Sequence, residues 1–374
     1  MLEQEVLAVA QTAKNASPAF AQATAQERNA ALTAMARALR DQSGAIVAAN
    51  AQDMDAARQA GTKESLLDRL MLDEGRVMAM ADALEDLVAL PDPLGRVFDS
   101  RTLDSGIQLS RVAVPLGVVA VVYEARPNVT ADAAGICLKS GNACVLRGGS
   151  LAAKSCAAIA HVLHDAAVSA GMPAGCIGII ESTDRAAADV LMGLRGVVDV
   201  LVPRGGAGLI AHCVDCAKVP VIETGTGNCH VYVHSTADFD MARNIVVNAK
   251  CRRYGVCNAC ETLLVDQSVA ERFLPELFGM LADKGVRIHG DELACKAALA
   301  AGEKRLSTDA ALQVERASEQ DWETEYLSPD LAVRCVSGTE QAIAHINRYG
   351  TMHSEAIVAD PNLAEGAAAI ERFV

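Results

Sequence analysis

A cysteine that follows two arginines and a glycine is the strongest candidate for covalent chemistry in this sequence. Cys257 comes after Arg252, Arg253 and Gly255, and an apolar run begins soon after it. Neighbouring cations and free backbone N–H groups stabilise a thiolate, which is the nucleophilic form of cysteine. Cys260 lies in the same segment, so the pattern predicts a reactive thiol here without choosing between the two cysteines.

Three glycine-containing turns could hold an anion such as a pyrophosphate. Each lies near the carboxyl end of a predicted strand or the start of a predicted helix, where free N–H groups and the helix dipole favour negative charge. None matches the G-x-G-x-x-G fingerprint, and a Gly-Gly pair also suits a plain tight turn. The turns are Lys-Ser-Gly-Asn at 139–142, Arg-Gly-Gly-Ser at 147–150 and Pro-Arg-Gly-Gly at 203–206.

The second of these turns bears on the choice of cofactor. Arg147 supplies a cation, and Ser150 stands where a carboxylate could bind the ribose 2′-hydroxyl of NAD. A carboxylate at that position would repel the 2′-phosphate of NADP. The combination of three turns, a cation and no carboxylate favours a nucleotide, and NADPH over NADH.

Alternating helices and strands must position these segments. Residues 2–90 are Ala-rich and amphipathic, which predicts a set of helices. Residues 112–123 are apolar and β-branched, as a strand covered on both faces is, and strand and helix patterns then alternate. This alternation predicts a doubly wound α/β domain, to which we assign residues 1–100 and 112–235.

The rest of the chain is predicted to form a second α/β domain and two smaller segments. The second domain covers residues 236–360. Residues 101–111 are polar and alternating, as an exposed strand would be. Residues 361–374 carry a helical pattern that stops without a cap or a breaking residue, so we expect a further segment beyond Val374.

Composition and charge exclude several classes of protein. The formal net charge of -14 repels nucleic acid. The longest apolar stretch contains Pro115 and Gly117 and is too short to span a bilayer, so no membrane contact is expected. The N-terminus lacks the basic start and apolar core of a signal peptide. We therefore expect a cytoplasmic protein.

The cysteines allow one alternative reading, a structural zinc site. Most of the 12 cysteines lie in apolar runs and are predicted to be buried packing groups in a reducing compartment. Two pairs, Cys213 with Cys216 and Cys257 with Cys260, have the spacing of metal ligands. About forty residues separate the pairs, whereas zinc sites of this type use loops of roughly 15 to 20 residues. We therefore assign no metal ligand, and a metal-binding scaffold stays the rival from another class.

Five separate motifs resemble the gamma-glutamyl phosphate reductases, also called glutamate-5-semialdehyde dehydrogenases, of the aldehyde dehydrogenase superfamily. They lie in the family's order and span residues 114–358, almost the whole chain. The motifs are VPLGVVAVVYEARPNVTADAAGICLKSGNACVLRGGS, DVLVPRGG, VPVIETGTGNCHVYV, GVCNACETLLV and YGTMHSEAIV.

This resemblance implies a fold and a reaction. The fold would be aldehyde dehydrogenase-like: a doubly wound cofactor domain, an α/β catalytic domain and a small β-flap used in oligomerisation, to which residues 101–111 would belong. The reaction would be NADPH-dependent reduction of L-glutamate 5-phosphate to L-glutamate 5-semialdehyde in proline biosynthesis. A homo-oligomer and channelling with glutamate 5-kinase are the partners that the resemblance suggests.

The resemblance also implies roles for individual residues. The cysteine of the GVCNA motif is Cys257, the implied nucleophile, and Asn128 matches the asparagine that helps to form the oxyanion hole. Arg147 matches a basic residue near the adenosine ribose. The candidate cofactor residues are Lys139, Gly141, Arg147, Ser150, Arg204, Gly205 and Gly206, and the candidate substrate residues are Arg253, Asn258 and His353.

The sequence departs from the family pattern in two places. Arg253 is followed by Tyr254 where the family has proline, which changes the loop before the cysteine. The end of the β-flap does not follow Val374, so we expect an incomplete flap and a weakened oligomer. Glu223 lies near the general-base position of oxidising members; a reaction that displaces phosphate needs no base to activate water, so Glu223 is left out of the catalytic set.

One rival enzyme lies within the same superfamily. It would oxidise a different aldehyde or act on a different acyl substrate, and it would need an acidic base and a preference for NAD. Arg147 together with Ser150 argues against that preference.

Overall fold

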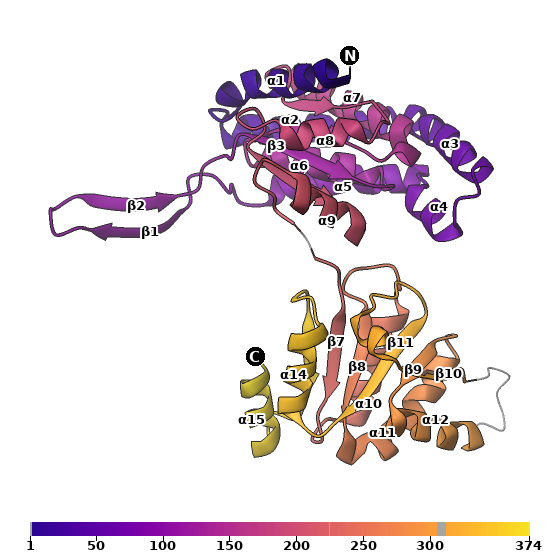
Figure 1. Cartoon of the computed structure of the whole chain (residues 1–374). Helices are drawn as coiled ribbons and strands as arrows, with labels where there is room; N and C mark the ends of the chain where they lie inside the picture. The colour runs from indigo at the N-terminus through magenta and orange to yellow at the C-terminus, as the bar shows by residue number, and fades with distance from the viewer. Residues whose placement is uncertain (1, 224, 305–311) are drawn as a thin grey trace. The chain divides into compact units, whose positions relative to one another are not determined.

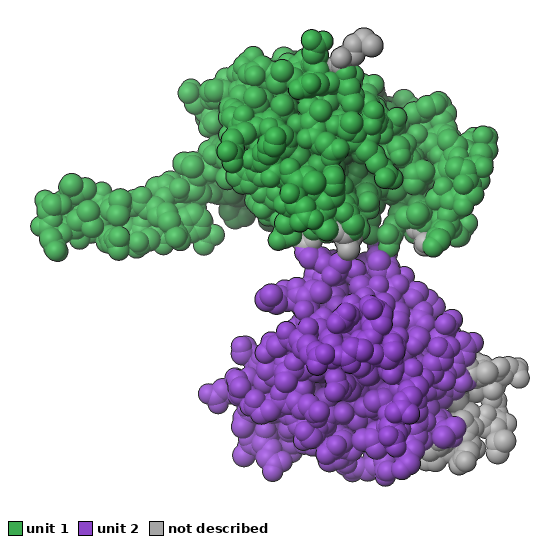
Figure 2. Space-filling model, viewed as in Figure 1, with its two compact units in different colours: residues 1–224 green, residues 225–374 purple. Residues whose placement is uncertain are grey.

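The structure is a computed structural model that describes residues 2–223, 225–304 and 312–374. The chain divides into two compact units, unit 1 with residues 1–224 and unit 2 with residues 225–374 (Figure 2). Each unit has its own hydrophobic core.

Unit 1 opens with the predicted helices. α2 begins with a capping box in which Thr24 and Glu27 bond each other's backbone N–H groups, which satisfies two otherwise free donors. α2 and α5 pack against each other through apolar faces that include Leu32, Met35 and Leu84. The helices are α1 (Leu2–Phe20), α2 (Ala25–Asp41), α3 (Ser43–Gln59), α4 (Glu64–Leu70) and α5 (Glu74–Ala89).

The sheet of unit 1 has four parallel strands in the order β5-β4-β3-β6. β3 is buried along its whole length, as its unbroken β-branched run predicts. Beyond these strands, a single isolated bridge joins Leu201 of β6 to Val221. The elements are β3 (Val118–Tyr123), α6 (Asn128–Lys139), β4 (Ala143–Arg147), η1 (Ser150–Ala152), α7 (Ala153–Ser169), β5 (Ile177–Ile179), α8 (Ala186–Gly193), β6 (Val200–Arg204) and α9 (Ala207–Cys216).

A hairpin extends from unit 1 and corrects one expectation (Figure 1). Residues 101–111 do not form one strand, because β1 (Val97–Thr102) and β2 (Gln108–Val112) pair antiparallel around a turn with Gly106 at φ 83°. The alternating polar pattern runs through this turn without a break, so the sequence did not reveal it. The partner of β2 is therefore β1, the strand just before it in the chain. Both strands are exposed along their whole length.

Unit 2 contains a six-stranded parallel sheet in the order β10-β9-β11-β8-β7-β12. The elements are β7 (Cys229–Val233), α10 (Phe239–Cys251), β8 (Cys260–Asp266), α11 (Gln267–Ala282), β9 (Arg287–Gly290), α12 (Glu292–Lys304), β10 (Val314–Arg316), α13 (Glu319–Glu323), β11 (Asp330–Val336), α14 (Thr339–Tyr349), β12 (Glu355–Val358) and α15 (Ala364–Phe373).

Two expected boundaries of the second domain differ from this arrangement. β7 was assigned to the first domain, yet it pairs with β8 and β12, so unit 2 begins before it. Residues 361–374 do not stand apart from the second domain. α15 packs on α14, and Phe373 stacks on Tyr232 of β7 with ring centroids 6.2 Å apart.

A buried ion pair lies at the base of the loop that carries Cys257. Lys250, at the end of α10, is fully buried and donates to Glu261 of β8, itself 1% exposed. Burial raises the pKa of Glu261 to about 7 in spite of the lysine. The second oxygen of Glu261 accepts the N–H of Leu327.

We predict that Lys250→Met lowers the free energy of unfolding of unit 2 by about 1–3 kcal/mol, because the buried Glu261 loses the partner of its hydrogen bond. Trp322, the chain's single tryptophan, is buried in unit 2 and reports its urea unfolding by fluorescence. The double variant with Glu261→Gln should recover most of the loss. A single variant as stable as the unchanged protein would contradict this assignment.

Candidate active site

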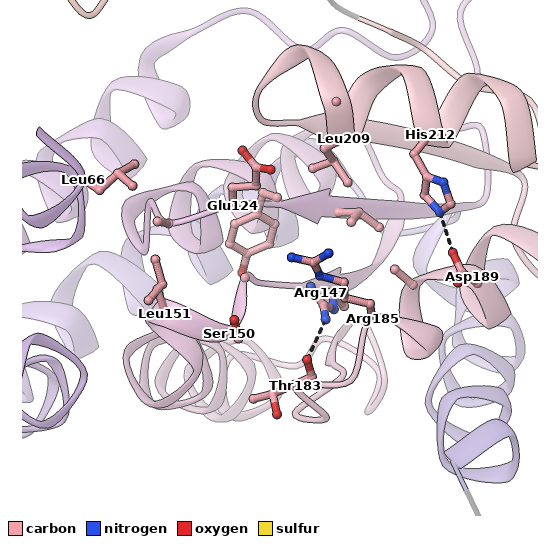
Figure 3. A pocket seen from close by; sticks show the side chains of 16 residues that line it. Leu66, Glu124, Arg147, Ser150, Leu151, Thr183, Arg185, Asp189, Leu209 and His212 are labelled. Carbon is pink, nitrogen blue, oxygen red and sulfur yellow. Dashed lines mark hydrogen bonds and ion pairs between the residues drawn. The ribbon is translucent and has the colours of Figure 1, made fainter. Parts of the chain in front are cut away.

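A cavity of about 690 Å³ lies at the carboxyl edge of the unit 1 sheet (Figure 3). Loops that follow three strands and the first turns of α9 form its walls. Parallel α/β sheets bind ligands at this edge, because the strand interiors are covered by helices. The lining includes Glu124 after β3, Arg147 at the end of β4, Ser150, Thr183, Arg185 and His212.

Arg147 is fixed in the wall of this cavity by hydrogen bonds to two backbone carbonyls. Its side chain is only 7% exposed, and Nη2 donates to the carbonyl oxygens of Thr183 at 3.2 Å and Asp184 at 3.0 Å. Its buried Nε finds no partner within the described part of the chain. Burial and the nearby Arg185 lower the pKa of Arg147 from its very high usual value. The positive charge of Arg147 in the cavity wall suits an anionic group.

Arg185 and Thr183 belong to the same cavity, although sequence reasoning missed them. They lie between β5 and α8 in a segment without the glycines that drew attention to the other turns. One signal could have indicated Arg185. It is a basic residue that follows β5, and β5 pairs with β4, the strand that ends at Arg147. Ser150 begins η1 at the same edge, so the structure brings it together with both arginines.

The carboxylate of Glu124 lies at the N-terminus of α9 and accepts a backbone hydrogen bond there. The Gly206 N–H donates to Oε2 of Glu124 at 2.8 Å, and a Cβ at Gly205 would meet the same carboxylate at 2.8 Å. The turn 204–206 therefore adjoins the cavity through Glu124, which sequence reasoning did not single out. An anion that used this helix terminus would have to displace the carboxylate.

Lys139 and Gly141 must be removed from the candidate cofactor set. They precede β4, at the amino edge of the sheet, whereas Arg147 ends that strand at the carboxyl edge. The Lys139 ammonium is held by Asn29 Oδ1 at 2.9 Å and by the Leu90 carbonyl at 2.8 Å. The turn at 139–142 has the glycine of an anion site, but it connects α6 to β4. Its lysine bonds residues in and next to the N-terminal helices and so supports their packing.

Asn128 begins α6 in unit 1 and is half-buried. Its Nδ2 donates to Oδ2 of Asp132, one turn along the helix, at 3.0 Å. Burial raises the pKa of Asp132, while the Asn128 hydrogen bond acts in the opposite direction.

In unit 2, the structure separates the two cysteines that the sequence could not rank. Cys260 starts β8, is 1% exposed, and has its pKa raised to about 12 by burial. Cys257 lies in the loop between α10 and β8 and is partly exposed. Of this pair, Cys257 is the thiol that a substrate can reach.

The backbone of Cys257 is tightly packed against the start of β7. A Cβ at Gly227 would lie 1.6 Å from the Cys257 carbonyl oxygen, so only glycine fits there. The same carbonyl accepts the thiol of Cys229 at 3.3 Å. Cys229 also contacts Nδ1 of His353 at 3.5 Å and Oγ of Ser354 at 3.2 Å. This chain of contacts brings His353 beside the loop of Cys257.

The other predicted residues of this region lie at the surface. Arg253 and Asn258 are exposed in the Cys257 loop, and Glu223 is exposed near the end of unit 1. Glu355, a neighbour of His353, is engaged internally, since its Oε2 accepts the backbone N–H of His230 at 2.8 Å.

The two Cys-x-x-Cys pairs differ in setting. Cys213 and Cys216 lie on α9 of unit 1, and Cys257 and Cys260 lie in unit 2. Among residues 2–223, 225–304 and 312–374, no group of three or more His, Cys, Asp or Glu side chains is arranged to hold a metal ion. No helix in those ranges is long and apolar enough to cross a membrane.

The fold and the site define an oxidoreductase of the aldehyde dehydrogenase class. The family model of the aldehyde dehydrogenase family matches residues 2–289. An acetylating aldehyde dehydrogenase from Geobacillus thermoglucosidasius has a similar fold, with a TM-score of 0.68, 22% identity, and coverage of 100% of this chain and 84% of that one. Enzymes of this family use NAD or NADP.

Within that class, the chain belongs to the gamma-glutamyl phosphate reductases. It is 52% identical to the gamma-glutamyl phosphate reductase of Moorella thermoacetica over 95% of this chain and 82% of the relative. It is 46% identical to that of Thermobifida fusca over 100% and 85%. The crystal structure of the Thermotoga maritima protein of this name matches with a TM-score of 0.90 and 38% identity, over 99% of this chain and 86% of that one.

We predict that Cys257→Ala lowers the NAD(P)-linked turnover by at least about 1,000-fold, as expected for loss of a nucleophile. Cys260→Ala should keep turnover within about threefold, because a buried thiol of raised pKa takes no part in the chemistry. Steady-state rates of both variants, with matched melting temperatures, decide the question. Equal losses in the two variants would contradict the choice of Cys257.

Proposed function

We propose that this chain reduces L-glutamate 5-phosphate to L-glutamate 5-semialdehyde, with release of phosphate, as a step of proline biosynthesis. Membership of the gamma-glutamyl phosphate reductases, at 52% identity to a relative over 95% of the chain, is the observation that carries the proposal. The accessible Cys257 and the cavity at Arg147 supply a nucleophile and an anion site of the kinds that this reaction needs.

The proposed chemistry begins with Cys257. Its thiolate forms a bond to the acyl carbon of the substrate, and the carbon–oxygen bond to phosphate breaks, which leaves a thioester and free phosphate. Asn128 and the backbone N–H of Cys257 are the proposed donors to the oxyanion that develops during this step. A thioester accepts hydride readily, whereas a carboxylate does not, so covalent catalysis makes the reduction feasible.

The residues of the unit 1 cavity fit NADPH. When bound, this cofactor supplies the hydride that reduces the thioester. Arg147 and Arg185 are the proposed partners of the 2′-phosphate. Ser150 places no carboxylate at the position where one would favour NAD. The turn with Arg204, Gly205 and Gly206 is the proposed neighbour of the other phosphates.

The substrate contacts are proposed in unit 2. Arg253 is exposed close to Cys257 in the chain, and its guanidinium suits the oxygens of an acyl phosphate. Asn258 and His353 are the further candidates; His353 reaches the Cys257 loop through Cys229.

We further propose a cytoplasmic homo-oligomer that can channel its substrate from glutamate 5-kinase. The exposed apolar residues of the β1–β2 hairpin support self-association, because such a ribbon is poorly stable alone in water. They include Phe98 (52% exposed), Ile107 (60%) and Leu109 (46%).

The reverse reaction tests the proposed activity. Glutamate 5-semialdehyde and NADP should yield NADPH only when inorganic phosphate is present, because phosphate must attack the thioester to release the acyl group. A simple aliphatic aldehyde should give a kcat/KM at least about 100-fold lower, since it lacks the polar groups of the substrate. NADPH formation that is independent of phosphate would indicate a hydrolytic aldehyde dehydrogenase instead.

Cofactor choice is tested separately. Arg147→Ala should raise KM for NADPH by about 10- to 100-fold, the worth of a charge-assisted hydrogen bond, and KM for NADH by less than about threefold. Arg195→Ala is the matched control, because Arg195 precedes β6 at the other edge of the sheet and should change neither constant. If the unchanged protein prefers NADH, the assignment of Arg147 is wrong.

A further inference from the structure

We propose that Cys216, His212 and Asp189 form a second reactive thiol site, at the rim of the unit 1 cavity, where a small disulfide can modify Cys216. This site lies outside the proposed chemistry of Cys257 and does not depend on it. His212 and Asp189 line the cavity (Figure 3). Cys216 is the last residue of α9, the helix that carries His212.

The geometry orients the histidine toward the thiol. Nε2 of His212 lies 2.7 Å from Oδ1 of Asp189, which belongs to α8. Nδ1 of the same ring lies 3.6 Å from Sγ of Cys216, one helical turn further along α9. A carboxylate can only accept, so the proton resides on Nε2 and the lone pair of Nδ1 faces the thiol. The thiol therefore donates to a base that a carboxylate holds in place, the arrangement that activates nucleophilic cysteines.

The helix itself does not activate this thiol. Cys216 is the last residue of α9, where the helix dipole disfavours an anion and favours a cation. Activation of this thiol therefore has to come from His212, which lies beside it. This dependence makes the role of His212 measurable.

Exposure combined with a histidine partner distinguishes Cys216 from several other described thiols. Cys229 contacts Nδ1 of His353 at 3.5 Å, but it is buried. Cys213, in the same helix, is buried, and burial raises its pKa. Burial likewise raises the pKa of the partly exposed Cys251 and Cys295. Cys216 is exposed and has a histidine partner, so an electrophile can reach it.

The modification is a thiol–disulfide exchange. The Cys216 thiolate forms a bond to one sulfur of a low-molecular-weight disulfide such as glutathione disulfide, and the original sulfur–sulfur bond breaks. The departing thiolate takes up the proton that Cys216 passed to His212. The disulfide is the oxidant, so no further reagent is needed. The adduct would lie next to His212 at the cavity wall.

The test measures labelling rates at single thiols. In a Cys257→Ala background, which removes the proposed nucleophile, each cysteine's rate of reaction with iodoacetamide is followed by peptide mass spectrometry at neutral pH. Cys216 should react at least about tenfold faster than Cys295 and Cys251. Glutathione disulfide in place of iodoacetamide should give a mixed disulfide at Cys216 first.

Two variants and one matched control separate activation from exposure. His212→Gln should slow labelling of Cys216 by about tenfold, and Asp189→Asn should slow it by a smaller factor, while the rate at Cys295 stays constant. His161→Gln removes a similarly exposed histidine that pairs with Glu181 at 2.9 Å, and it should leave Cys216 unaffected. A Cys216 rate that His212→Gln leaves unchanged, or that all three variants reduce equally, would overturn the proposal.

Discussion

The parallel arrangement of both main sheets is the constraint on which the candidate sites depend. Four strands in unit 1 and six in unit 2 all run parallel, and the central strands β3 and β8 are buried at every position. Most of their side chains form the core, and of the β3 residues it is Val122 and Tyr123, at the carboxyl end, that line the cavity. Polar groups that can do chemistry must therefore lie where strands end or begin, and Glu124, Arg147 and Cys257 all lie in such places.

Burial then decides which of many similar groups can react. The chain has 12 cysteines, and the low-dielectric interior disfavours the thiolate of those packed in the cores, as the pKa values of Cys156 and Cys260 show by rising to about 11 and about 12. Cys257 and Cys216 lie outside the cores, in a loop and at a helix end. The same protein can thus carry inert and accessible thiols a few residues apart.

The unit 1 cavity shows which of its residues local sequence patterns could predict. The turn that contains Arg147 and Ser150 was predicted, because a glycine pair after a short apolar run is a short-range signal. Arg185 was not predicted, because it reaches the same cavity from a segment with no such signal. Glu124 was not predicted either, because its contact is with Gly206, in the loop that follows another strand.

The sequence by itself determined the element types, the doubly wound class and the segment that contains the candidate nucleophile, because periodicity, turn residues and motifs are properties of neighbouring residues. Tertiary structure decided the rest. Strand direction within the assembled sheet decides at which edge each turn lies. It places Lys139 at the amino edge and Arg147 at the carboxyl edge. The difference between Cys260 and Cys257 follows from packing against β7, because burial arises from segments that are distant in the chain.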